Sequence, residues 1–287
     1  MNFSAGTKVG RNVFHWGERT YVMGIVNMSP DSFSGDGNSA IDAAVTQVKN
    51  MIADGVDILD VGGESTKPGA PPVSIETEIE RVIPVIKRLA SEVAVPISVD
   101  TYKLAVGERA LAAGAAVIND QWGLKKEPRL AELAAKKNVP LILMSNQRDI
   151  GSYDASVGRD TATYTDVIAE VMASLKESIA LALKAGMPPE NIIIDPGIGF
   201  GKTWQQDIEI VRRLCELKVL KYPILLGTSR KSLIKMVLNL PAKDRVEGTA
   251  ATVAIGIANG ADIVRVHDIK QITRICRMTD AIVRGIG

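Results

Sequence analysis

Short runs of branched apolar residues alternate with longer segments of helical periodicity along the chain, and this alternation restricts the fold more than any other feature. Eight runs predict strands at Val22–Val26, Asp57–Val61, Ile97–Val99, Ala116–Ile118, Leu141–Met144, Ile192–Ile194, Ile224–Leu226 and Ile263–Val266. The periodic segments predict helices at Ala40–Asp54, Glu76–Ala90, Lys103–Ala113, Arg129–Lys137, Ala162–Ala185, Gln205–Val219, Gly248–Ala258 and Ile269–Arg284. Because strands and helices alternate strictly, we expect an α/β fold, a closed parallel (β/α)8 TIM barrel rather than an open doubly wound sheet.

Three predicted junctions between a helix and the next strand share a glycine. Gly55, Gly114 and Gly260 each stand where a helix should end, and glycine readily takes the left-handed conformation that closes a helix. No low-complexity linker divides the 287 residues, a length that suits one barrel. We therefore expect a single barrel over residues 21–287, preceded by an N-terminal extension of residues 1–20.

Charge and cysteine content exclude several classes of function. With 34 basic and 33 acidic residues, the chain has no excess charge to hold nucleic acid or an anionic membrane. No uncharged apolar run approaches the ~18 residues of a membrane span, and the N-terminus lacks the apolar segment of a secretory signal. Cys215 and Cys276 lie in helical patterns without metal-ligand spacing, which predicts buried free thiols. We expect a cytoplasmic protein with neither nucleic-acid nor membrane partners.

The stretch IIIDPGIGFGKT, residues 192–203, has the glycines of a phosphate-binding loop but not their spacing. A P-loop that ends in Gly201-Lys202-Thr203 needs its first glycine at position 196, where this chain has Pro196, which has no N–H to donate. The dinucleotide spacing fails as well, because the last glycine comes one residue too early. Asp195 is therefore the residue of functional interest in this stretch.

Polar side chains follow every predicted strand: Asn27, Asp60, Asp100, Asn119 with Asp120, Ser145 to Gln147, Asp195, Ser229 to Lys231, and Arg265 with His267. In a barrel all these positions meet at the carboxyl-terminal mouth, where active sites are built. Each residue alone also fits ordinary turn or helix-cap chemistry, but their coincidence favours a shared pocket. Asp100 and Asp195 end apolar strands, so they need hydrogen-bond donors, which a flat heterocycle with ring N–H and amino groups would provide.

The ends of the seventh and eighth predicted strands favour an anionic ligand. Barrels often bind phosphate at these two strands, and here they carry GTSRKS (227–232) and VRVH (264–267). Arg265 can bind two phosphate oxygens at once, and His267 and Asn27 can add donors. An ion pair at the barrel rim is the alternative role for Arg265.

Seven motifs together resemble those of the dihydropteroate synthases, in that family's order, from about residue 20 to the C-terminus. They are MGIVNMSPDSFSGDG (23–37), GGESTKPGA (62–70), SVDT (98–101), IND (118–120), DPGIGFGKT (195–203), GTSRKS (227–232) and GTAATVAIGIANGADIVRVHD (248–268). The resemblance implies a (β/α)8 transferase of folate biosynthesis that is a sulfonamide target. Such enzymes join p-aminobenzoate to 6-hydroxymethyl-7,8-dihydropterin diphosphate with Mg²⁺ and commonly form homodimers.

Matching the motifs residue by residue implies a role for each site residue. Pterin binding is implied for Asp100, Asn119, Asp195, Lys231 and Arg265. Diphosphate binding is implied for Asn27, Thr66, Arg265 and His267, with Asn27 also the metal ligand. The implied p-aminobenzoate pocket consists of Phe33, Lys67, Pro68 and Ser232. Catalytic roles are implied for Asp31, in the first mobile loop of the family, and for Lys231 and Arg265.

The chain departs from the family at two places. Lys67 stands where the family usually has arginine, and Met144-Ser145-Asn146-Gln147 stands where it usually reads Met-His-Met-Gln. Two rival functions stay open. One is a methyltetrahydrofolate methyltransferase, although those barrels lack the SRKS and RVH motifs, and the other is a non-catalytic pterin-binding paralogue. The apolar stripe of the last helix, from Ile269 to Ile282, fits packing on the barrel as well as a dimer contact.

Overall fold

The computed structural model describes residues 6–28, 37–65, 70–148, 153–154, 159–160 and 164–285. Eight parallel strands form the barrel: β3 (Tyr21–Asn27), β4 (Ile58–Gly62), β5 (Ile97–Asp100), β6 (Val117–Asp120), β7 (Leu141–Met144), β10 (Ile192–Asp195), β11 (Leu225–Leu226) and β12 (Ile263–Val266). They are neighbours in chain order, and β12 pairs with β3. A bridge between Ile194 and Ile224 joins β10 to β11, so the ring closes as predicted.

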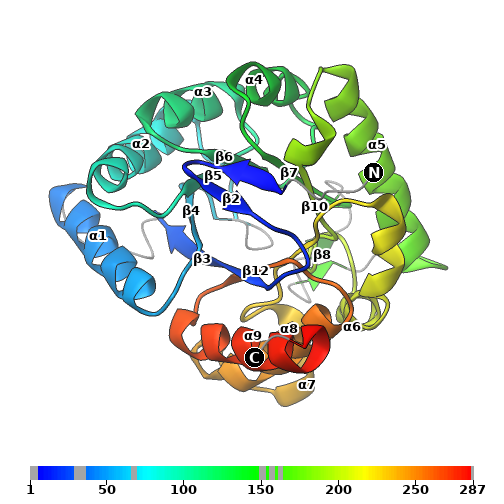
Figure 1. Cartoon of the computed structure of the whole chain (residues 1–287). Coiled ribbons are helices and arrows are strands. Elements are labelled where there is room, and N and C mark those ends of the chain that lie inside the picture. Colours follow the sequence, from blue (N-terminus) through cyan, green and yellow to red (C-terminus); the bar gives the residue numbers. More distant parts are fainter. Residues whose placement is uncertain are drawn as a thin grey trace.

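A layer of helices surrounds the strands in Figure 1. Its members are α1 (Gly37–Ala53), α2 (Ile75–Glu92), α3 (Leu104–Ala113), α4 (Arg129–Lys137), α5 (Val167–Lys184), α6 (Trp204–Arg212), α7 (Ser232–Leu238), α8 (Val246–Ala258) and α9 (Ile269–Arg284). Short 3-10 turns occur at Pro189–Asn191, Leu214–Leu220 and Ala242–Asp244, and β8 (Tyr153–Asp154) pairs with β9 (Arg159–Asp160). Gly55, Gly114 and Gly260 have φ values of 92°, 114° and 101°, which confirms the predicted left-handed junctions.

The three largest differences between the predicted and the observed helices concern α7, α6 and α5. The helix α7 was not predicted, because its seven residues give fewer than two turns of periodicity. The segment predicted as one helix over Gln205–Val219 is α6 followed by a 3-10 helix, η2 (Leu214–Leu220). The helix α5 begins at Val167 rather than near Ala162, because the carboxylate of Asp166 accepts the backbone N–H groups of its first turn.

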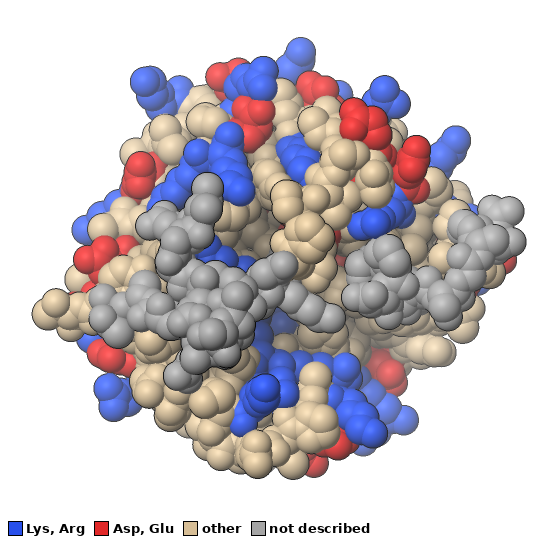
Figure 2. Space-filling model, turned by 180° about the vertical axis from the view of Figure 1, so that it is seen from behind, with Lys and Arg blue, Asp and Glu red and all other residues tan. Residues whose placement is uncertain are grey.

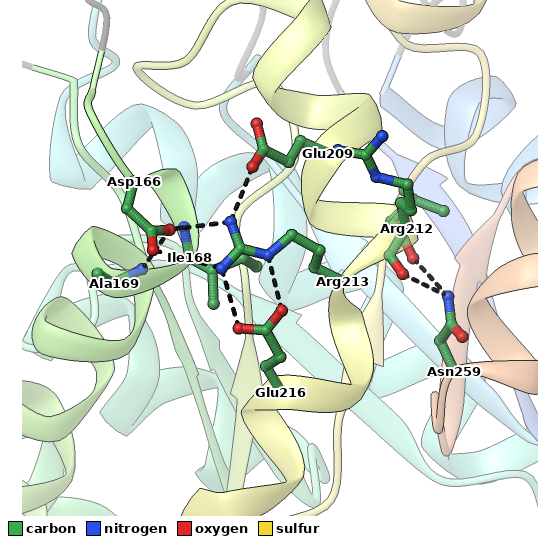
Figure 3. A network of polar contacts seen from close by, with 9 residues as sticks. Asp166, Ile168, Ala169, Glu209, Arg212, Arg213, Glu216 and Asn259 are labelled. Atoms are coloured by element: carbon green, nitrogen blue, oxygen red, sulfur yellow. Dashed lines mark hydrogen bonds and ion pairs between the residues drawn. The ribbon is translucent and has the colours of Figure 1, made fainter.

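Ion pairs hold the junction between α6 and η2 against α5 (Figure 3). The guanidinium of Arg213 contacts Asp166 at 3.1 Å, Glu209 at 2.8 Å and Glu216 at 2.7 Å. The amide of Asn259 donates to the carbonyl oxygens of Val211 and Arg212, which satisfies acceptors in the last turn of α6. These contacts anchor the C-terminal end of α6, and the first turn of α6 directly follows the DPGIGFGKT stretch.

The barrel interior is apolar at one end and polar at the other. Met23, Ile58, Val117, Ile142, Ile193, Leu225 and Ile263 form one buried cluster with Val9, Phe14 and Tyr21. Val9 and Phe14 belong to the hairpin of β1 (Thr7–Val9) and β2 (Asn12–Phe14), which crosses this amino-terminal end in Figure 1. Alternate strand residues face the same side, so the positions two residues later also face inward. Those positions include Asp60, Asn119, Asp195 and Arg265.

Both cysteines are free, but only one is buried. Cys276 is buried on α9, as predicted, whereas Cys215 is exposed in η2, so the prediction that both are buried was wrong. On α9 the side chains of Ile269, Ile272 and Cys276 pack into the core, and Ile282 is 70% exposed. Packing on the barrel therefore accounts for most of the stripe. None of the described helices is both long and apolar enough to cross a membrane.

Candidate active site

A cavity of about 530 Å³ lies at the carboxyl-terminal mouth of the barrel. Figure 2 shows this face, with Lys and Arg side chains in and around its central hollow. Among the described residues, six cations line the cavity: Arg148, Arg230, Lys231, Lys235, Arg245 and Arg265. The described carboxylates that line it are Glu64 and Asp100. The mouth is therefore locally basic although the chain as a whole carries a net charge of +1, and it favours anionic ligands.

Arg265 is held by two carboxylates inside the barrel, and Asn119 shares one of them. Its Nε donates to Oδ2 of Asp60 at 2.6 Å, and its Nη2 donates to Oδ2 of Asp100 at 2.8 Å. The amide of Asn119 donates to the same Oδ2 of Asp60 at 3.0 Å. The alternative predicted for Arg265 was an ion pair at the barrel rim, but its two partners lie within the barrel, where they are almost fully buried.

Asp100 shows how burial and charge compete at this site. Burial raises the pKa of Asp100 to about 7, although the neighbouring guanidinium of Arg265 opposes the shift, and Asp60 adds to it by like-charge repulsion. The other oxygen of Asp100 accepts a hydrogen bond from Nε2 of Gln121. Protein donors therefore contact both oxygens of the carboxylate, and an incoming ligand has to compete with them.

Lys231, which lines the cavity, lies beside the buried Asp195. The ammonium of Lys231 donates to the carbonyl oxygen of Ile198 at 2.6 Å, and burial lowers the Lys231 pKa to about 8 against the attraction of Asp195. Burial also raises the pKa of Asp195, whose Oδ1 accepts the N–H of Gly197 at 2.7 Å. The turn before Lys231 is held by Arg230, which has a positive φ of 60° and pairs with Asp268 at 2.5 Å.

The DPGIGFGKT loop is held together by its buried lysine. Lys202 is buried, and its ammonium donates to the carbonyl oxygens of Ser145, Gly197 and Phe200 at 2.9 to 3.1 Å. Gly197 has a φ of 70°, and a Cβ at this position would lie 2.1 Å from the carbonyl oxygen of Ser145. The loop therefore packs directly on the end of β7, which places Asp195 at the mouth.

His267 is a neutral side chain in the free protein. Burial, with the nearby charges of Arg230 and Arg265, lowers its pKa to about 4. Its Nδ1 lies 3.0 Å from the hydroxyl of Ser229, and both residues line the cavity. A neutral imidazole can donate one hydrogen bond to a bound anion, and the anion would in turn raise the His267 pKa.

The structure brings most of the described candidate residues together. Asn27, Asp100, Lys231, Ser232, Arg265 and His267 line the cavity. Asn119 and Asp195 are more deeply buried. Asn119 contacts the buried Asp60, and Asp195 lies beside Lys231 of the lining. The candidates Asp31, Phe33, Thr66, Lys67 and Pro68 lie outside the described residues.

Sequence reasoning assigned no ligand role to four polar residues of the mouth, although it placed Asp60 at one of the strand ends that should form the pocket. Glu64 and Arg148 line the cavity, Gln121 contacts Asp100, and Asp60 contacts Arg265. Glu64, Gln121 and Arg148 follow predicted strands and Asp60 lies near the end of one, so their position was the available signal. Ser145, where the family usually has histidine, is buried, and its hydroxyl has no hydrogen-bond partner among the described residues.

Comparison with known proteins agrees with this geometry. A closed barrel with a polar pocket at the carboxyl ends of its strands is the arrangement of a TIM-barrel enzyme. The family model described as pterin binding enzyme matches residues 23–267. Dihydropteroate synthase of Clostridium beijerinckii is 52% identical over 96% of this chain and 99% of its own length. That of Bacillus subtilis is 49% identical over 94% of this chain and 91% of its own length.

Solved structures show the same likeness. The dihydropteroate synthase of Clostridium difficile, crystallised in the presence of pteroic acid, superposes with a TM-score of 0.88 at 47% identity, over 95% of this chain and all of that chain. The Xanthomonas albilineans enzyme with 4-aminobenzoic acid superposes with a TM-score of 0.85 at 38% identity, covering 94% of this chain and 95% of that one. The chain belongs to the dihydropteroate synthase family of pterin-binding transferases.

Proposed function

We propose that this chain joins p-aminobenzoate to 6-hydroxymethyl-7,8-dihydropterin diphosphate, giving dihydropteroate and diphosphate. One observation supports this most directly, namely that a single mouth combines buried acceptors with a basic rim. Asp100, Asn119 and Asp195 can accept hydrogen bonds from a pterin ring, and Arg265 and His267 provide donors for a diphosphate.

The chemistry needs no nucleophile from the protein. Loss of diphosphate from the pterin methylene leaves a cation that the electron-rich ring shares, and the amine of p-aminobenzoate then attacks this carbon. Fixed dipoles and charges that hold the ring and stabilise the departing anion lower the barrier to such a step. Asp195 and Lys231 hold the ring in this proposal, and Arg265 with His267 receives the departing charge.

Magnesium fits the mouth as an ion carried by the substrate. Among the described residues no cluster of three His, Cys, Asp or Glu side chains suits a metal, so a dedicated protein cage is not seen there. Mg²⁺ often binds through substrate phosphates and only one or two protein oxygens. Asn27, at the end of β3, lines the same cavity as Arg265 and His267, and its amide oxygen can provide one ligand. Bound there, the ion would neutralise charge on the diphosphate.

The purified protein is expected to form dihydropteroate only when both substrates and Mg²⁺ are present. Removal of the metal with excess EDTA should lower the rate at least tenfold, and added Mg²⁺ should restore it. An unchanged rate in EDTA would remove the metal from the mechanism. Pterin binding without any product would instead favour the non-catalytic paralogue, whereas methyl transfer from methyltetrahydrofolate would favour the second rival.

We further propose that the protein is a cytosolic homodimer whose copies meet through an exposed apolar face. This face consists of Val237 and Leu238 on α7, Ile255 on α8, and Met278 and Ile282 on α9. The three helices lie side by side in Figure 1, and each of the five side chains is more than 40% exposed. An apolar patch of this kind on a soluble protein commonly marks an interface.

Substitution within this face is expected to separate the dimer. Ile255→Glu should convert it to monomer in sedimentation velocity at micromolar concentration, because a buried unpaired carboxylate is costly in an interface. Val13→Glu, a similarly exposed apolar residue on the hairpin of β1 and β2, is the matched control and should leave the dimer intact. A parent protein that sediments as a monomer would disprove the proposed assembly.

A further inference from the structure

Asp60 accepts hydrogen bonds from two site residues, although it is not among the described residues that line the cavity. Its side chain is fully buried on β4. A single oxygen, Oδ2, accepts from Arg265 at 2.6 Å and from Asn119 at 3.0 Å. The other oxygen, Oδ1, has no hydrogen-bond partner among the described residues. One carboxylate therefore orients two side chains that the proposed function assigns to ligand binding.

The two carboxylates that hold Arg265 are not equivalent. Asp100 lines the cavity, so a ligand can reach its oxygens and compete with Nη2 of Arg265. Asp60 is fully buried and is not among the described residues that line the cavity, so its bond to Nε can persist. Asp100 is therefore an exchangeable partner of the guanidinium, and Asp60 is a permanent one.

The contact with Asn119 also restricts how that amide can bind. A carboxylate only accepts hydrogen bonds, so the Asn119 atom that faces Asp60 must be Nδ2. The carbonyl oxygen of the amide then remains available as an acceptor for ring N–H groups. Without the negative charge at Asp60, the amide could flip, and the guanidinium would be held by Asp100 alone.

We propose that Asp60 is a positioning residue that keeps Arg265 and Asn119 oriented when the pterin substrate displaces Arg265 from Asp100. The inference rests on the proposed function. Arg265 keeps its Nε bond to Asp60 in the bound state, and its released Nη2 hydrogens turn toward the ligand. Asp60 itself touches no substrate atom.

Calorimetric titration with 6-hydroxymethyl-7,8-dihydropterin diphosphate in Mg²⁺ buffer tests this role without requiring turnover. Asp60→Asn keeps the shape and removes the charge, and it should weaken affinity at least tenfold. Asp120→Asn is the matched control. Asp120 is equally buried, but its side chain accepts from the backbone N–H groups of Trp122 and Leu124. Its substitution should change affinity less than twofold.

A double-mutant cycle separates positioning from general destabilisation. If Asp60 acts mainly through Arg265, then Asp60→Asn should cost less than threefold in an Arg265→Gln background. Equal losses in the two backgrounds would overturn the proposal, as would an unchanged affinity of Asp60→Asn or an equal loss in Asp120→Asn. Should Asp60→Asn alone fail to fold, a ligand-bound crystal structure of the parent protein decides, because it needs no variant.

A crystal structure with the bound pterin diphosphate gives a second readout. Arg265 should retain Asp60 and should have left Asp100. Retention of Asp100 with loss of Asp60 would overturn the assignment. A parent protein that binds this ligand but forms no product would disprove the proposed reaction and leave the role of Asp60 supported by the titrations, whereas a parent protein without binding would disprove both.

Discussion

Asp195→Asn is expected to weaken pterin binding by about 2–4 kcal/mol, the range for leaving buried polar groups unpaired. Asp195 is 6% exposed, and its Oδ1 accepts the N–H of Gly197 at 2.7 Å. If the asparagine oxygen keeps that bond, its amide nitrogen replaces the carboxylate oxygen that would accept from the ring. A donor then faces the ring N–H and amino groups. The affinity should therefore decrease by a factor between roughly thirty and several hundred.

Calorimetric titration of 6-hydroxymethylpterin measures this loss directly. The matched control is Asp207→Asn, because Asp207 is also buried and accepts the N–H of Gly199 in the same loop. The control should stay within threefold of the parent if its role is confined to the loop. A pterin affinity of Asp195→Asn within twofold of the parent would show that Asp195 is a turn residue without a ligand role.

Arg265→Ala is expected to separate the two ends of the pocket. It should weaken binding of the pterin diphosphate strongly, because each lost charge-assisted hydrogen bond to the anion is worth about 1.5–3 kcal/mol. A pterin without diphosphate loses none of these bonds and should be affected much less. Asp195→Asn should weaken both ligands alike, since both contain the ring.

Arg265→Ala is also expected to destabilise the folded protein. Arg265→Ala leaves the buried carboxylates of Asp60 and Asp100 without their shared cation, which should lower the free energy of unfolding by about 3–5 kcal/mol. Circular dichroism and urea unfolding must therefore show a folded variant before the titrations are compared, and Arg265→Gln is the milder substitute. Equal losses for the two ligands would show that Arg265 serves the ring, and the diphosphate assignment would move to Lys67 or Lys231.

Much of the fold was predictable because it depends on local patterns. The boundaries of β7, α4 and α9 agree with the prediction at both ends, since period, glycine junctions and caps act over a few residues. The missed helix α7 and the 3-10 helix η2 are short elements in which tertiary contacts outweigh periodicity. Exposure of Cys215 was mispredicted for the same reason, because a helical pattern was assumed where the backbone is 3-10.

The candidate site was predictable as a set of residues but not as a network. Polar residues at strand ends indicated the mouth, and the ordered motifs indicated the family. The pattern did not show that Lys202 would donate to three carbonyl oxygens or that Arg265 would be shared by two acids. Hydrogen-bond partners depend on distances of a few tenths of an ångström, which strand and helix periodicity does not specify.

The sequence by itself therefore determined the order of strands and helices, the closed barrel and the end at which polar residues gather. Only the tertiary structure decided which of these residues are partners. Arg265 and Asp60 are 205 residues apart, and they meet because β12 pairs with β3 and β3 pairs with β4. Closure of the ring brings these two inward-facing side chains together, so that they form a 2.6 Å hydrogen bond. Local propensity cannot encode this contact, because the contact depends on every intervening strand.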